Sequence, residues 1–133
     1  MQKFNTGIVV AAIVGCVLLQ GCHDQAVIWS TSAVSPNGQL IASADTTQWG
    51  GLGTAYVATG VYLKQSKSSQ HPLTILSFIN ESAYPAGVTE VKLSWLSDSQ
   101  LDVTYKPGAT IDFQAIKALG VNITVHKIDV VSK

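Results

Sequence analysis

Residues 90–105 read Glu-Val-Lys-Leu-Ser-Trp-Leu-Ser-Asp-Ser-Gln-Leu-Asp-Val-Thr-Tyr and carry the clearest structural signal in the chain. Apolar side chains alternate with polar ones over residues 91–95 and again over residues 101–105, which is the period of a half-buried β-strand. The Ser-Asp-Ser sequence at residues 97–99 favours a turn between the two runs. The stretch therefore predicts an antiparallel hairpin with one face toward a core.

Four further strands are expected before this hairpin, at residues 27–34, 40–44, 54–64 and 73–79. The first two are joined by Ser-Pro-Asn-Gly at residues 35–38, where proline fixes φ and glycine accepts a positive φ. They are therefore expected to form another hairpin. The last of the four is apolar on both faces, which predicts a central strand covered on both sides.

Two segments follow the hairpin of residues 90–105. Residues 112–119 are expected to form two turns of helix, with Asp112 as the N-cap and Gly120 just after the last turn. Residues 121–126 alternate again and predict a last strand. The whole pattern indicates a mainly β fold, a small antiparallel sandwich or open barrel of about six to seven strands with at most one short helix.

The composition bounds the class of protein. The chain has 133 residues, of which 47% are hydrophobic and 12% charged, and its formal net charge is zero. These values predict one small domain and argue against a disordered chain, a coiled coil or a nucleic-acid binder, because each of those needs more charge. The chain contains no arginine, so it has no guanidinium group to bind phosphate or carboxylate with two parallel hydrogen bonds.

Much of the hydrophobic content lies near the N-terminus. Residues 8–19 form an uncharged apolar run that follows a short polar start containing Lys3. The run is shorter than the roughly 20 residues that span a bilayer, and its form is that of an export signal. We therefore expect a signal peptide over residues 1–21, with a retained membrane anchor as the alternative.

The end of this segment carries the most specific motif in the sequence. Residues 19–22 read Leu-Gln-Gly-Cys and resemble the lipobox of bacterial membrane lipoproteins. The resemblance implies that the Cys22 thiol receives a diacylglycerol and that the signal peptide is cleaved between Gly21 and Cys22. It also implies a lipidated tether over residues 22–26, followed by a single β-rich domain over residues 27–133.

The same resemblance bears on location. In Gram-negative lipoproteins an aspartate directly after the lipidated cysteine signals retention in the inner membrane, and here that position holds His23. The resemblance thus implies a lipid anchor in the cell envelope, with the outer membrane facing the periplasm favoured in a Gram-negative host. The expected partners are the membrane, through the lipid on Cys22, and an envelope protein or polymer.

A second, weaker resemblance concerns the β-rich part. Residues 35–42 read Ser-Pro-Asn-Gly-Gln-Leu-Ile-Ala and are similar to the Ser-Pro-Asp-Gly hairpin of small exported bacterial β domains of unknown function. The later Trp95, the Ser-Asp turn and the strand ending in Tyr105 fit the same pattern. This resemblance implies a small β domain, and it implies no particular activity because none is established for that family.

Candidate catalytic chemistry is sparse. Cys16 would leave with the signal peptide, so Cys22 would be the single thiol of the mature chain, which then has neither a disulfide nor a Cys-x-x-Cys site. His23, His71 and His126 lack the spacing of paired metal ligands. No Gly-x-Ser-x-Gly motif surrounds a serine. We expect no catalytic residue, metal site or cofactor, and no nucleic-acid partner.

A glycine-rich segment at residues 48–53 is the remaining candidate site. It lacks the spacing of a phosphate-binding loop, but an aromatic side chain on a loop can contact a partner. Trp49, Gly50 and Gly51 are therefore candidate contact residues, although Trp49 packed on the core is the alternative. We expect a lipid-anchored, non-catalytic binding or interaction module. The alternatives are an exclusion or inhibitor lipoprotein that blocks an envelope receptor or hydrolase, and a small periplasmic hydrolase that uses His71 or His126 with a carboxylate.

Overall fold

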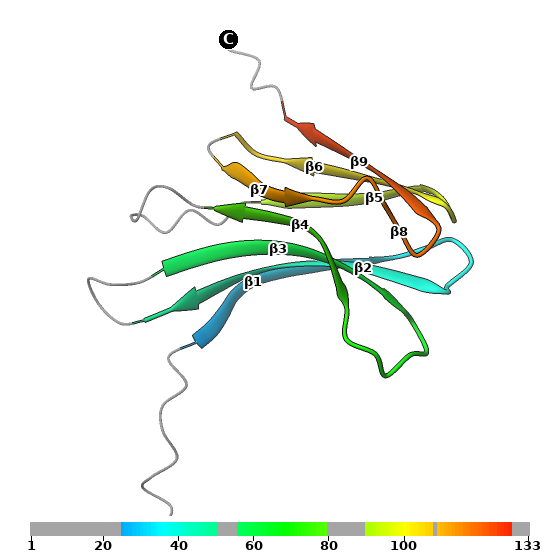
Figure 1. Ribbon diagram of the computed structural model, residues 1–133, viewed down its shortest axis with the longest axis horizontal. Helices are drawn as coiled ribbons and strands as arrows, with labels where there is room; N and C mark the ends of the chain where they lie inside the picture. The colour runs from blue at the N-terminus through cyan, green and yellow to red at the C-terminus, as the bar shows by residue number, and fades with distance from the viewer. Residues whose placement is uncertain (1–24, 51–55, 80–89, 108, 129–133) are drawn as a thin grey trace, which may run out of the picture.

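The fold is given by a computed structural model, which describes residues 25–50, 56–79, 90–107 and 109–128. Within these ranges the protein is all β, with nine strands and no helix (Figure 1). The strands are β1 (Gln25–Val34), β2 (Leu40–Trp49), β3 (Tyr56–Gln65), β4 (Leu73–Ile79), β5 (Val91–Ser97), β6 (Gln100–Tyr105), β7 (Thr110–Gln114), β8 (Lys117–Ala118) and β9 (Val121–Lys127).

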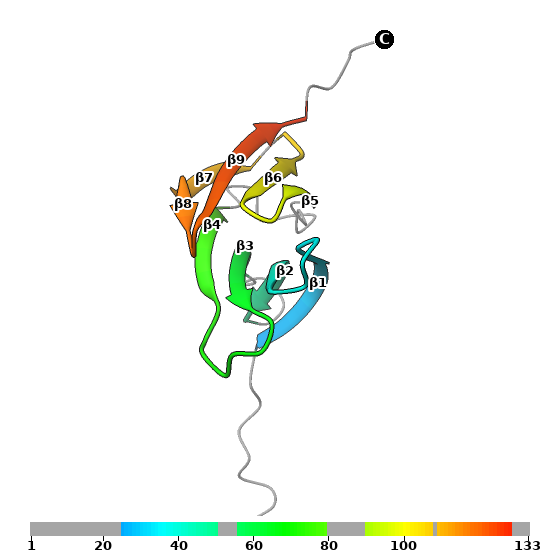
Figure 2. The ribbon, with the colours of Figure 1, turned by 90° about the vertical axis from the view of Figure 1, so that its right-hand side faces the viewer.

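The strands form two sheets that lie as two layers (Figures 1 and 2). The five-stranded sheet has the order β1-β2-β3-β4-β7 and is antiparallel throughout. The four-stranded sheet has the order β5-β6-β9-β8, and its central pair, β6 and β9, is parallel. The predicted small β sandwich is thereby confirmed. The described ranges contain nine strands rather than the expected six to seven, and one parallel pair that the sequence pattern did not indicate.

The helix predicted over residues 112–119 is wrong. This segment lies in β7 and β8 and passes from one sheet to the other, since β7 pairs with β4 and β8 pairs with β9 (Figure 2). The backbone N–H of Ala115 donates to the carbonyl of Ile75 at 2.8 Å. Partners on two sheets satisfy the backbone of the segment, and tertiary pairing of this kind overrides weak local helix propensity.

Both predicted hairpins are present. In the first, Gly38 has a φ of 74° and its N–H donates to the Ser35 carbonyl at 2.8 Å, as a tight turn requires. In the second, β5 pairs with β6 around residues 97–100. The N–H of Asn37 donates to Asp98 Oδ1 at 2.8 Å, so the turns of the two hairpins meet at one end of the molecule.

The prediction that residues 73–79 are covered on both faces is wrong. Leu73 and Ile79, at the two ends of β4, are 48% and 37% exposed. Ile75 and Leu76 are both fully buried because the register of β4 against β3 shifts at Ile75, which lies between the paired residues Thr74 and Leu76. A β-bulge of this kind turns two successive side chains inward, and it explains why Ile75 and Leu76 are adjacent apolar residues in the sequence.

The core lies between the two sheets. Its buried apolar side chains come from both layers: Ala42, Ala44, Val61, Leu63, Ile75, Leu76, Phe78, Val91, Leu101, Val103, Val121 and Ile123. Phe78 of the five-stranded sheet contacts Tyr105 of the four-stranded sheet, with ring centroids 4.9 Å apart. Trp95 packs against this core and donates its Nε1–H to the Ala33 carbonyl at 3.0 Å. This bond joins β5 to β1, where the two sheets also approach each other.

A buried pair of hydroxyl groups lies on the inner face of the five-stranded sheet, which faces the other sheet. Thr46 Oγ1 and Thr59 Oγ1 are 2.8 Å apart, and both side chains are almost fully buried. Replacing Thr46 by valine is expected to lower the free energy of unfolding by about 1–3 kcal/mol, because the Thr59 hydroxyl would stay buried without a partner. Urea denaturation measures this change.

The double variant T46V/T59V is the matched control for that experiment. Neither hydroxyl remains, and valine keeps nearly the shape of threonine, so its stability should return to within about 1 kcal/mol of the parent. A double variant less stable than T46V alone would contradict the assigned pairing.

Candidate functional site

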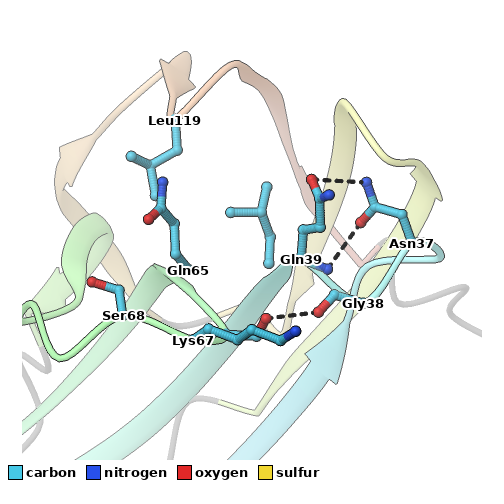
Figure 3. A pocket seen from close by; sticks show the side chains of 9 residues that line it. Asn37, Gly38, Gln39, Gln65, Lys67, Ser68 and Leu119 are labelled. Carbon is cyan, nitrogen blue, oxygen red and sulfur yellow. Dashed lines mark hydrogen bonds between the residues drawn. The ribbon is translucent and has the colours of Figure 1, made fainter.

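An open hollow lies at the end of the five-stranded sheet where the hairpin turns meet. It has a volume of about 730 Å³ and is lined mainly by polar residues (Figure 3). The lining comes from the β1–β2 turn, the end of β3, the following loop and the β8–β9 turn: Asn37, Gly38, Gln39, Leu40, Gln65, Ser66, Lys67, Ser68 and Leu119. We call it the amide groove, because Asn37, Gln39 and Gln65 carry side-chain amides.

One wall of the amide groove is held in place by local hydrogen bonds. Asn37 Oδ1 accepts from the backbone N–H of Gln39 at 3.0 Å and from the Ser35 hydroxyl at 2.8 Å. The Ser66 hydroxyl donates to the Gly38 carbonyl at 2.7 Å (Figure 3). The turn and the loop after β3 are therefore tied together, and this wall is formed before any ligand arrives.

The opposite side of the groove offers side-chain donors. The hydrogen bonds and ion pairs found within the described ranges include none from the Gln65 amide or the Lys67 ammonium group. Among the described residues that line the groove there is one cation, Lys67, and no carboxylate or imidazole. Amide groups donate and accept at once, so the groove suits a ligand rich in hydroxyl or amide groups.

Leu119 lines the groove in a strained backbone conformation. Its φ is 48° and that of Gly120 is 76°, and the two residues form the tight turn that joins β8 to β9. Leucine adopts the left-handed region at a cost of about 1–2 kcal/mol. Strain of this kind is concentrated at binding sites, and here it holds an apolar side chain against the groove.

The two described histidines lie in different places. His71 is exposed and lines a smaller hollow of about 60 Å³ beside the amide groove. His126 lies on the outer face of the four-stranded sheet, with its Nε2 2.8 Å from Asp102 Oδ1. That oxygen is buried and no hydrogen bond of good geometry reaches it within the described residues. The pair is thus a close polar contact on a sheet face, outside both hollows.

Tyr62 lies on the outer face of the five-stranded sheet, and its ring lies over Gly60. A Cβ atom at Gly60 would collide with the phenol oxygen of Tyr62, so the glycine makes room for the ring. Burial raises the pKa of Tyr62, and the charge of Asp45 and a hydrogen bond to it raise that pKa further. The phenol therefore stays protonated at neutral pH beside Asp45.

The candidate contact residue Trp49 lies at the end of the sheet opposite the amide groove. It is the last residue of β2 rather than part of a loop, and it is 36% exposed. Its ring centroid is 5.7 Å from that of Tyr56, which is its partner across the β2–β3 pair. Gly50 follows with a φ of 83°, whereas Gly51 lies outside the described residues.

The motif that resembles a lipobox lies outside the described residues, as do Gly21, Cys22, His23 and the whole of the expected signal peptide. Within the described ranges, no helix is long and apolar enough to cross a bilayer. No group of three or more His, Cys, Asp or Glu side chains suited to a metal ion is found in that part of the chain.

Sequence reasoning missed the amide groove and the partner of Trp49. The turn at residues 35–38 and the polar loop at residues 65–72 were each recognisable, but no local signal indicates that they meet. The Trp49–Tyr56 pair could have been found, because the two residues directly flank the glycine-rich segment of a hairpin. The predicted strand ended at residue 44, whereas β2 continues to Trp49, and the early end concealed the pair.

Comparison of the chain with protein-family models, curated proteins and solved structures found no match.

Proposed function

We propose that this chain is a lipid-anchored, non-catalytic binding module of the bacterial cell envelope. The observation that carries the proposal is the Leu-Gln-Gly-Cys motif at residues 19–22, placed at the end of an apolar run of signal-peptide length. Cys22 precedes Gln25, the first residue of β1, by three residues. A chain of that length spans at most about 10 Å, so a lipid on Cys22 would hold the β domain directly at the membrane surface.

The arrangement of the two ends of the five-stranded sheet supports a binding role. Gln25 pairs with Trp49 at one end, whereas Val34, Leu40 and Gln65 lie at the other end, beside the amide groove. A domain anchored near Gln25 would present the groove away from the membrane. The groove would then be open to a partner in the envelope.

The chemistry of the groove favours a polar polymer as that partner. Three amides, two serine hydroxyls and one ammonium group line it, and such groups exchange hydrogen bonds with sugar hydroxyls and peptide amides. Peptidoglycan, the envelope polymer built of sugars and short peptides, offers both kinds of group. We assign no reaction to the site, and the proposal gives the His126–Asp102 contact no catalytic role.

The intact mass of the protein purified from bacterial membranes tests the anchor. We expect a mass equal to residues 22–133 plus two or three acyl chains, because stable anchoring needs at least two chains at about 0.8 kcal/mol per buried methylene. An unmodified full-length mass would refute the lipid anchor and support the retained-anchor alternative.

Co-sedimentation with purified peptidoglycan tests the groove. Replacing Gln65 by alanine is expected to weaken binding about threefold to tenfold, since one hydrogen bond contributes about 0.5–1.5 kcal/mol. Lys92→Ala, on the outer face of the four-stranded sheet, is the control and should bind like the parent. Equal binding by both variants, or no binding by the parent, would contradict the assignment of the groove to this polymer.

A further inference from the structure

The outer face of the five-stranded sheet is uncharged at one end of its strands and carries charged residues farther along them. The row of residues nearest the start of β1 is Gln25, Trp49 and Tyr56, and the next row is Val27, Thr47, Ala58, Ile79 and Thr110. Neither of these two rows contains a charged residue. The third row contains Asp45, and the last contains Lys64.

Large apolar side chains in the first two rows are exposed. Val27 is 60% exposed, Tyr56 52%, Ile79 37% and Trp49 36%. They come from four neighbouring strands and point to the same face. We call these four residues the aromatic patch. Exposed apolar groups gathered on one face of a small domain mark a contact surface.

The position of the patch indicates what it contacts. It lies on the end of the sheet where β1 begins, three residues after Cys22. Tryptophan and tyrosine have an apolar body and a polar tip, and they are enriched where membrane proteins cross the boundary between acyl chains and headgroups. We infer that the aromatic patch docks into the interfacial region of the membrane that holds the lipid anchor. This inference rests on the proposed lipidation of Cys22.

Docking of the patch would fix the orientation of the domain. A lipid tether of a few residues restricts distance but leaves the domain free to rotate, whereas a second contact restricts rotation as well. In β2 and β3, Trp49 and Tyr56 lie at one end, and the β1–β2 turn and the loop after β3 lie at the other (Figure 1). With Trp49 and Tyr56 in the interface, the amide groove, which these turns line, points away from the bilayer. The charged rows that contain Asp45 and Lys64 stay in water.

Fluorescence quenching by brominated lipids tests the inference. The purified membrane form is reconstituted into phosphatidylcholine vesicles whose acyl chains carry bromine, and its tryptophan emission is compared with that in unbrominated vesicles. We expect Trp49 to lose most of its emission, so that the parent is quenched and Trp49→Phe is not. Trp29 and Trp95 contribute little to the loss, because both pack against the core.

A reporter at the groove end serves as the matched control. Gln70→Trp in the Trp49→Phe background places a tryptophan in the exposed loop after β3, and its emission should be the same in both kinds of vesicle. Equal emission of Trp49 in the two vesicles, from protein that carries acyl chains by mass, would overturn the docking and leave the lipid anchor standing. Protein without acyl chains would overturn both.

Discussion

Replacing Cys22 by serine is expected to abolish the incorporation of a labelled fatty acid into this protein. A serine hydroxyl is not ionised at neutral pH, whereas the proposed lipid acceptor is the thiolate of Cys22. In the proposed sequence of events cleavage follows lipidation, so the variant should also keep residues 1–21 and have the mass of the full chain. Metabolic labelling followed by mass spectrometry measures both effects.

The second cysteine of the chain provides the control. Cys16 lies within the apolar run, six residues before Cys22, and Cys16→Ser should label as strongly as the parent and be cleaved at the same bond. Loss of label from both variants would indicate a general failure of export. Label that persists in Cys22→Ser would refute the assignment of the anchor to that residue.

Replacing Phe78 by alanine should destabilise the domain by about 3–5 kcal/mol, the range found when a buried aromatic side chain is truncated. Phe78 is 2% exposed and contacts Tyr105 across the two sheets. The loss combines the transfer of the ring to water with an unfilled cavity between the layers. Because small domains have total stabilities of about 5–15 kcal/mol, this one change should shift the urea midpoint strongly.

Phe113 offers a control with the same change of side chain. It lies on β7 and is 48% exposed, so Phe113→Ala should alter the free energy of unfolding by only about 0.5 kcal/mol. Similar effects at the two positions would mean that the contact between Phe78 and Tyr105 does not hold the sheets together.

Local sequence pattern was sufficient to predict the structure where it depends only on one strand and the turn next to it. The alternation at residues 91–95 and 101–105 correctly predicted which side chains of β5 and β6 face the core. The Pro-Asn-Gly sequence before Gln39 correctly predicted the first tight turn. Both signals are local, because side-chain alternation and turn chemistry depend only on neighbouring residues.

Pattern failed where the partner of a segment decides its conformation. The segment from Asp112 to Leu119 has acceptable helix ends, yet it pairs with β4 and then with β9. The run at residues 73–79 looks doubly covered, but a bulge buries two successive side chains. In the first case backbone hydrogen bonds to distant strands outweigh a local helix preference worth a few tenths of a kcal/mol per residue. In the second case the register of β4 against β3 decides which side chains are buried.

The candidate functional features also differ in whether the sequence alone can indicate them. The proposed lipidation motif is contiguous, so residues 19–22 indicate it without a fold. The amide groove joins Asn37, Gln65 and Leu119, which are far apart in the chain, and the aromatic patch joins Val27 to Ile79 across four strands. Alternation tells which face a side chain is on but not which strand lies beside it. Strand order and register therefore created both surfaces, and only the tertiary structure contains them.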